Sequence, residues 1–324
     1  MTKPIIIIGA GMAGLLAGNM LRRQPFQIVE RQTSLPNNHH AVLRFRTQRV
    51  AEQVHVPFRE VRVFKACDEP DPIRAAMLYS YKVTGRYEVR SLIDLAPCSR
   101  FIAPPDFIER MASGFEEGKH IAYGVDGAEF FDPRSITAGV KAIISTLPMP
   151  ALMDALDYQG PRPAFSSMPG YTLSVDLPGV DVYATRYYAS PDEFYYRASI
   201  TGNRLIVEYA GEPRAHMVNE LAGSTYRMME VERVLADFGI NSFAIHADSV
   251  KINVAPYAKL GALSVEDRRK AMDFMYWATT HFNIYSLGRF ATWRSRLLMD
   301  DIVDDVLKIE RWISGSRYDI QKGL

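Results

Sequence analysis

The N-terminus combines a short apolar run with a cluster of glycines. Ile5–Ile8 are four consecutive isoleucines, a pattern typical of a parallel strand that is buried on both faces. Gly9 permits a tight turn, Gly11 leaves the backbone bare for a ligand, and Gly14 allows a helix to lie against the strand. This order of strand, turn and helix predicts a site for the pyrophosphate of a dinucleotide. The residues expected to contact it are Gly9, Gly11, Met12, Ala13 and Gly14.

The residues that follow the glycines support this interpretation. A helix is expected from Ala10 to about Arg23, with its first N–H groups and its dipole directed at the phosphates. Phe26–Glu30 is the predicted second strand, and it ends in an acid that can accept hydrogen bonds from an adenosine ribose. Glu30 and its neighbour Arg31 are therefore assigned to the cofactor site. The alternative is a glycine-rich turn that binds no ligand.

Length and composition are those of an ordinary globular protein. The chain has 324 residues, 48% of them hydrophobic and 23% charged, which allows a large core and excludes disorder. A net charge of +1 gives no bulk attraction to nucleic acid or membrane, so such a partner must be recognised locally. The apolar runs are too short for a signal peptide or a membrane span, and a cytoplasmic location is expected.

Neither the cysteines nor the histidines form a reactive pattern. Cys67 and Cys98 are far apart and form no Cys-x-x-Cys pair, which favours two structural thiols. His39 and His40 have no partners at metal-ligand spacing, so no metal site is expected. No Ser/His/Asp arrangement stands out. A cofactor must therefore supply the reactive chemistry.

Three separated stretches resemble the flavoprotein superfamily that includes amine oxidases and UDP-galactopyranose mutases. They are residues 9–31, residues 142–150 with the sequence AIISTLPMP, and residues 283–289 with the sequence NIYSLGR. The resemblance implies that the cofactor is FAD. The sequence contains no second glycine fingerprint, so a separate nicotinamide domain is not expected.

The same resemblance assigns further residues to the cofactor. Thr146 and Pro148 belong to the second stretch, and Gly288 and Arg289 end the third. In the superfamily this late glycine lies beside the flavin. The helix that begins near Asp300 is then expected to point its N-terminus at the flavin ring, where it would stabilise the negative charge of the reduced form.

The resemblance also implies the domain organisation. The fold class is α/β, with a Rossmann-type FAD-binding domain and an inserted, mainly β substrate domain. The expected boundaries are 1–160 for the first part of the FAD-binding domain, 161–260 for the insertion and 261–324 for the last part. The domains are expected to pack against each other, because no linker of low complexity separates them.

Alternating apolar residues predict the elements of the insertion. The expected strands are Tyr171–Leu177, Val180–Tyr188, Phe194–Ile200 and Leu205–Tyr209, with a hairpin turn at 201–203. A helix from about 216 to 238 should cover this sheet. A second helix is expected from Val265 to about His281, with Ser264 as its N-cap.

Residues 39–65 carry six basic side chains against two acidic ones. One interpretation is that Arg44 binds the cofactor and Arg46 a substrate carboxylate, since the guanidinium fork suits such groups. A groove for the phosphates of nucleic acid is a second interpretation. The third is a solvated strand edge, because alternation places Arg44 and Arg46 on one polar face.

Candidates for the chemistry itself are fewer. Tyr209 and Lys259 are the proposed catalytic residues and Tyr257 a proposed substrate contact, because they precede the return of the chain to the predicted flavin strand. Glu208 adjoins them. Most tyrosines of the insertion are expected to be ordinary half-buried strand residues.

A narrower resemblance rests on residues 35–39 (LPNNH), 43–46 (LRFR) and 101–107 (FIAPPDF). These stretches are similar to short bacteriophage flavoproteins, some of which are linked to thymidine hypermodification. The resemblance implies a FAD-dependent lyase that removes glyoxylate from N-glycyl-modified thymidine in phage DNA and leaves aminomethyl-deoxyuridine. The implied partner is an amine-bearing substrate, with no membrane and no obligate protein partner, in the host cytoplasm.

Two other functions remain open. The segment around Gly288 also resembles the redox-neutral sugar-nucleotide mutases, although the Gly-Pro-His pattern of that branch does not follow His39-His40. A non-catalytic FAD-binding protein is the third alternative.

Overall fold

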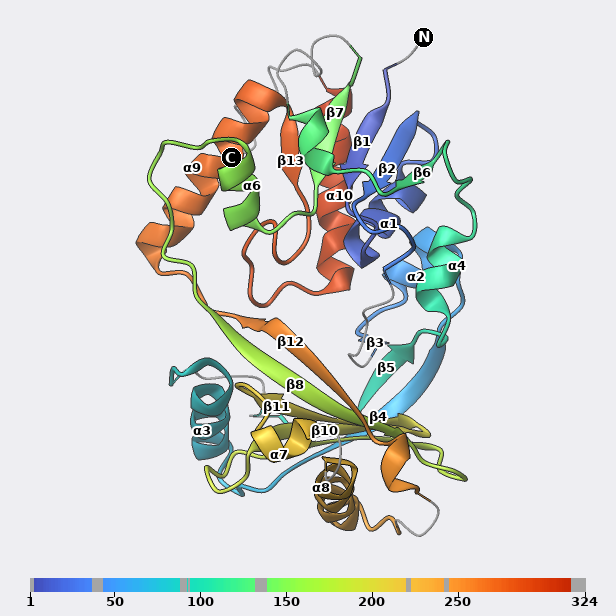
Figure 1. Ribbon diagram of the computed structural model, residues 1–324, viewed down its shortest axis with the longest axis vertical. Coiled ribbons are helices and arrows are strands. Elements are labelled where there is room, and N and C mark those ends of the chain that lie inside the picture. Colours follow the sequence, from blue (N-terminus) through green and yellow to red (C-terminus); the bar gives the residue numbers. More distant parts are fainter. Residues whose placement is uncertain are drawn as a thin grey trace.

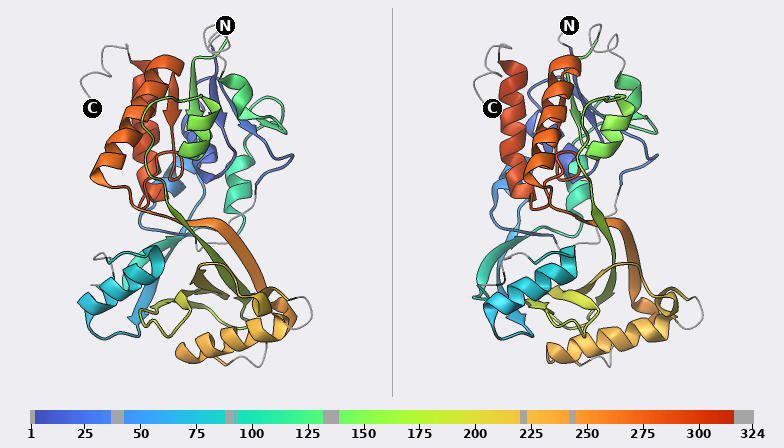
Figure 2. Two further views of the ribbon diagram at one scale, coloured as in Figure 1. Left: turned by 60° about the vertical axis from the view of Figure 1, so that its left-hand side comes forward. Right: turned by 90° about the vertical axis from the view of Figure 1, so that its left-hand side faces the viewer.

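The chain folds into two lobes, shown in Figure 1 and from two further sides in Figure 2. We call the lobe with the N-terminal strand the first lobe and the other the second lobe. The computed structural model describes the backbone, but not the side chains, of residues 256–258. The described ranges are 3–36, 43–87, 92, 94–131, 139–219, 223–241 and 245–315.

The first lobe contains a parallel sheet with the strand order β13-β7-β1-β2-β6 in the described part of the chain. All four strand pairs are parallel. The four isoleucines of β1 are all buried, which confirms the predicted central strand. The strands are β1 (Ile5–Ile8), β2 (Phe26–Glu30), β6 (Ile121–Tyr123), β7 (Ala142–Ser145) and β13 (Ile284–Ser286).

Helices cover both faces of this sheet. Ile5 and Ile7 point to one face, where they join one core cluster with α1 and α10, and Ile6 and Ile8 point to the other, where they join a second cluster with α6 and α9. The helices of the first lobe are α1 (Met12–Met20), α2 (Arg49–Val54), α4 (Phe107–Ala112), α6 (Met149–Ala155), α9 (Val265–Phe282) and α10 (Met299–Ser314), with a 3-10 turn at Gly127–Phe130.

The sequence predicted α1, α9 and the start of α10 near Asp300, where the structure places Met299 as its first residue. The Ser264 side chain accepts a hydrogen bond from the Asp267 N–H at 3.0 Å, which confirms the predicted start of α9. Helix α1 ends at Met20, earlier than the predicted Arg23. The Gln24 N–H closes a turn onto the Leu21 carbonyl just before Pro25, which disfavours helical backbone in the residue preceding it.

The second lobe is built on a mostly antiparallel sheet with the order β12-β8-β11-β10-β9-β4-β5-β3. The predicted hairpin turn is confirmed, since Gly202 has a φ of +63° and Thr201 pairs with Arg204. The strands are β3 (Arg44–Phe45), β4 (Arg59–Cys67), β5 (Cys98–Ile102), β8 (Ser167–Asp176), β9 (Val182–Tyr187), β10 (Tyr195–Gly202), β11 (Arg204–Ala210) and β12 (Lys251–Leu260).

The second sheet differs from the expected layout in one respect. Strands β3–β5 lie within residues 1–160, which we assigned to the FAD-binding domain, yet they extend the second sheet through a parallel pairing of β4 with β9. This pairing joins Phe64 to Ala184, a separation that local periodicity does not encode. The chain therefore enters the second lobe twice, and the boundaries at 160 and 261 stay a prediction.

Helices also cover the second sheet. The predicted helix 216–238 is interrupted, because Asn219 has extended backbone at the end of α7 (Ala215–Val218) before α8 (Gly223–Asp237) begins. Helix α8 packs its buried Val231, Val234 and Leu235 on one face of the sheet. Helix α3 (Pro72–Thr84) forms a separate cluster, and a 3-10 turn at Ala247–Ser249 precedes β12. None of the described helices has the length and apolar run that a bilayer crossing requires.

We predict that Leu173→Ala destabilises the second lobe. Leu173 is fully buried in the cluster beneath α8, so its truncation leaves a cavity and should cost about 2–5 kcal/mol in the free energy of unfolding. Val254→Ala on β12, where the side chain is exposed, is the control and should cost less than about 1 kcal/mol. Urea unfolding measures both, and equal losses would contradict the assigned core.

Candidate functional site

The turn between β1 and α1 is closed by glycines that the packing requires. Gly9 has a φ of +97°, and a Cβ there would overlap the Thr146 hydroxyl. A Cβ at Gly14 would overlap the carbonyl oxygen of Gly9. Only glycine lets the first turn of α1 approach the end of β1 this closely.

Gly11 has a different role. Its φ of −70° and ψ of 176° are available to any residue, so the backbone conformation does not require glycine there. A Cβ at Gly11 would meet no atom of the described chain within 4 Å. It would project into open space beside the first turn of α1, whose N–H groups lack intrahelical acceptors. Bare backbone beside a helix N-terminus is what binding of a phosphate group requires.

The site lies where the strand order changes direction. From β1 the chain passes to β2 on one side, and later to β7 on the other. Loops that leave the carboxyl ends of such neighbouring strands diverge, and ligands of open α/β sheets bind in the crevice between them. The glycine turn follows β1 and Thr146 follows β7, so both border this crevice.

Glu30 lies beside the glycine turn, as the sequence predicted. One carboxylate oxygen accepts a hydrogen bond from the Ala10 N–H at 2.8 Å and the other from the Gln32 N–H at 2.9 Å. The carboxylate therefore stabilises the turn itself. Each oxygen retains a further lone pair for a ribose hydroxyl. Arg31, the next residue, is exposed.

The second and third stretches converge on the same turn. The Ile8 carbonyl accepts hydrogen bonds from the Thr146 N–H at 3.0 Å and from the Thr146 hydroxyl at 2.7 Å. Gly288 has a φ of +98°, and a Cβ there would lie 3.2 Å from the Ala13 Cβ. Pro148 is the N-cap of α6, and Arg289 follows Gly288. The structure thus brings together the glycine turn, Thr146 and Gly288.

The start of α10 is fixed by two acids. Asp301 accepts a hydrogen bond from the Leu298 N–H at 2.8 Å. The buried Asp300 accepts from the Thr47 N–H at 3.2 Å and from the Thr47 hydroxyl at 2.5 Å. Asp300 therefore holds the segment after β3 against α10. The Arg46 side chain in that segment is exposed, and its role as a substrate contact stays a prediction.

Arg44 lies away from the glycine turn. Its guanidinium donates to the Thr201 hydroxyl at 2.9 Å, to the Thr185 hydroxyl at 2.7 Å, and to the carbonyls of Ala184 and Ile200. Burial and, less strongly, the positive charge of Arg197 lower the pKa of Arg44 from its ordinary value of 12.5 to about 10. Arg44 therefore joins β3 to β9 and β10 across the second sheet, and its assignment to the cofactor stays a prediction.

The structure also separates the two proposed catalytic residues. Tyr209 stacks on Tyr171 at 4.2 Å and donates to Glu230 on α8 at 3.3 Å, whereas Lys259 lies 3.7 Å from Glu208. Neighbouring residues of a strand point to opposite faces, so Tyr209 and Glu208 cannot share a site. The Tyr257 side chain lies outside the described residues.

A charged cluster occupies the face opposite α8. Arg197 donates two hydrogen bonds to Glu208, one of them at 2.8 Å, and the Tyr196 hydroxyl donates to Glu208 at 3.0 Å. The Lys259 ammonium lies 4.9 Å from the centre of the Tyr196 ring. Arg197 was missed from the sequence. The register of the predicted hairpin would have found it, because counting outward from the turn pairs Arg197 with Glu208.

No group of metal-binding side chains occurs among the described residues, and His39 and His40 lie outside them.

The sequence matches no family model and no curated protein, whereas the fold matches solved structures. A reduced UDP-galactopyranose mutase is 14% identical, with a TM-score of 0.69 over 97% of this chain and 94% of that one. A putative protoporphyrinogen oxidase from Exiguobacterium sp. 255-15 is 9% identical, with a TM-score of 0.57 over 95% and 99%. A probable FAD-dependent monooxygenase from Pseudomonas aeruginosa is 15% identical, with a TM-score of 0.54 over 97% and 87%. These similarities confirm the predicted fold class.

We predict that acid weakens the second lobe through Glu208. Burial alone would raise the pKa of this carboxyl, but Arg197 and Lys259 hold it at about 2, below its ordinary value of 4.5. A lowered pKa in the folded state stabilises the fold above pH 4.5, and this contribution is lost as the pH falls towards 2. Glu208→Gln should cost about 3 kcal/mol at neutral pH and flatten the pH dependence in this window.

Urea unfolding between pH 7 and pH 2 measures this effect, with Glu52→Gln at an exposed position as the control. An unchanged acid profile in Glu208→Gln would contradict the ionised state of Glu208.

Proposed function

We propose that this chain is a FAD-dependent enzyme. The observation that carries the proposal is the open side of Gly11 at the N-terminus of α1, in the crevice between β1 and β7. Helix N-termini in such crevices bind pyrophosphate, and Glu30 lies beside the turn, where it would accept hydrogen bonds from a ribose. The solved structures that match this chain have the same fold, and one of them is a probable FAD-dependent monooxygenase.

The residues present fit this cofactor. Backbone N–H groups of Gly11, Met12 and Ala13 would bind the pyrophosphate, and Glu30 would accept hydrogen bonds from the ribose. The segment at Gly288 packs on Ala13 and leads into the loop before α10, so it connects the phosphate site to the start of that helix.

For the reaction we infer oxidation of an amine C–N bond, with N-glycyl-modified thymidine in DNA as the substrate. Bound FAD would supply a two-electron acceptor, so that the glycyl amine becomes an imine that water cleaves into glyoxylate and an aminomethyl group. This assignment rests on the resemblance of residues 35–39, 43–46 and 101–107 to the phage flavoproteins. A cytoplasmic location, in the host if the chain is phage-encoded, belongs to the same proposal.

Charge supports an anionic substrate. The face of the second sheet opposite α8 carries Arg197, Lys259 and Arg44 against Glu208, so positive charge is in excess there. A glycyl carboxylate would be attracted to this face. Arg46 and Arg62 are exposed and are candidates for contacts with DNA phosphates. No specific observation favours the sugar-nucleotide mutase, because similarity at 14% identity reaches only the fold.

We predict that Gly11→Val yields a folded protein without flavin. The backbone of Gly11 accepts a side chain, but the added group would occupy the position of the pyrophosphate. Flavin absorbance per protein should fall about tenfold or more, with urea unfolding of the flavin-free forms unchanged. Gly139→Ala, also open and without positive φ, is the control. Normal flavin content in Gly11→Val would contradict the assigned site.

The substrate assignment has its own test. Flavin-loaded protein, incubated in air with DNA that contains N-glycyl-modified thymidine, should release glyoxylate and leave aminomethyl-deoxyuridine, as mass spectrometry of the nucleosides would show. Turnover of UDP-galactopyranose only after dithionite reduction would contradict the lyase assignment and support the mutase. Bound flavin without either product would indicate a binding protein.

A further inference from the structure

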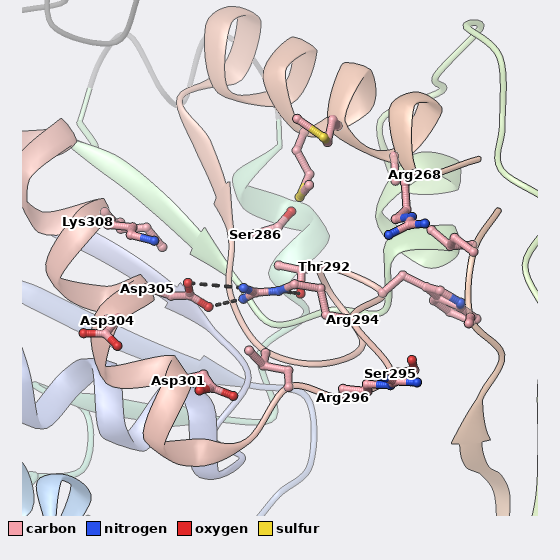
Figure 3. Close-up of a pocket in the computed structure, with 18 of the residues that line it drawn as sticks. Arg268, Ser286, Thr292, Arg294, Ser295, Arg296, Asp301, Asp304, Asp305 and Lys308 are labelled. Carbon is pink, nitrogen blue, oxygen red and sulfur yellow. Dashed lines mark hydrogen bonds and ion pairs between the residues drawn. The ribbon is translucent and has the colours of Figure 1, made fainter. Parts of the chain in front are cut away.

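A second cavity lies apart from the dinucleotide crevice. It has a volume of about 1080 Å³ and opens between α9 and α10, above β13 (Figure 3). Strand β13 is the edge strand of the parallel sheet, and β7 separates it from β1, which precedes the glycine turn. None of the residues that line the cavity belongs to the turn or to Glu30.

The walls of this cavity suit a planar aromatic group. Met272 and Met275 contribute from α9, Trp312 from α10, and Trp293 from the loop between β13 and α10. Met272 is 56% exposed, although apolar side chains of this size are usually covered. Thioether sulfurs and indole rings both make favourable contacts with aromatic molecules.

Two buried polar atoms in the wall have no hydrogen-bond partner among the described residues. They are the Ser286 hydroxyl on β13 and the indole nitrogen of Trp293, whose side chain is only 7% exposed. Buried polar groups of this kind are ordinarily satisfied, so two unpaired ones in a single wall mark an unusual local structure. Trp293 also has a φ of +48°, a strained conformation for a bulky residue, and such strain clusters at ligand sites.

The lining carries an excess of positive charge. Five basic residues face three acids, and each acid is already engaged. Asp301 binds the Leu298 N–H, Asp304 pairs with Arg49 from outside the cavity at 2.6 Å, and Asp305 pairs with Arg294. The basic residues are Arg86, Arg268, Arg294, Arg296 and Lys308.

We propose that this cavity binds a planar aromatic molecule that carries a carboxylate, sulfonate or phosphate group. The aromatic body lies between the methionines and the tryptophans that line the cavity. Arg268 from α9 and Lys308 from α10 add positive charge on opposite sides of the lining, which favours a ligand with an anionic group (Figure 3). This ligand site goes beyond the proposed function, because none of the residues that we assign to FAD lines the cavity.

Calorimetric titration of the purified full chain tests the proposal, with 1-naphthalenesulfonate as the probe. We expect saturable binding below about 1 mM, at least about tenfold weaker binding of neutral 1-naphthalenemethanol, and none of methanesulfonate. No saturable binding of the sulfonate, or equal affinity for the neutral compound, would overturn it.

Variants then locate the site. Arg268→Gln and Met272→Ala should each weaken binding of the sulfonate about threefold or more, with flavin content unchanged. Arg269→Gln is the matched control, since this neighbour on α9 is 85% exposed and lies outside the lining. Full affinity in both Arg268→Gln and Met272→Ala, or release of flavin by the probe, would place binding elsewhere and refute the assignment.

Discussion

The approach of Gly14 to the carbonyl of Gly9 determines how the first lobe is assembled. No side chain fits between them, so the first turn of α1 lies directly on the end of β1. The Ile8 carbonyl, at the same point, accepts both hydrogen bonds of Thr146. The loop that follows β13 packs against Ala13 through Gly288. Segments far apart in sequence thus meet around one backbone turn. Of the turn glycines Gly9, Gly11 and Gly14, only Gly11 has open space beside its Cα.

The two faces of the second sheet differ in polarity. The face under α8 is apolar and holds the stacked pair of Tyr171 and Tyr209. The opposite face is polar, and its buried Glu208 is satisfied by Arg197 and Tyr196. A buried carboxylate with more than one cation beside it remains ionised and leaves positive charge in excess. That excess is the basis of our proposal that the substrate is anionic.

Local signals in the sequence predicted local structure well. The four isoleucines, the glycine turn and Ser264 specify elements within a few residues of themselves, and each lies where it was expected. Pairing across long separations was not predictable in this way: β4 joins β9 although the alternation in its sequence fits any half-exposed strand. Arg44 shows the same limit, because its partners on β9 and β10 follow it by 140 residues or more. No sequence motif indicated the cavity between α9 and α10, because its lining comes from separate segments of the chain.

An experimental structure of the chain with FAD added tests the central claim most directly. The account predicts a pyrophosphate oxygen within about 3 Å of the backbone nitrogen of Gly11 or Met12, with the isoalloxazine ring directed towards the start of α10. FAD bound elsewhere, with no phosphate at the glycine turn, would contradict it.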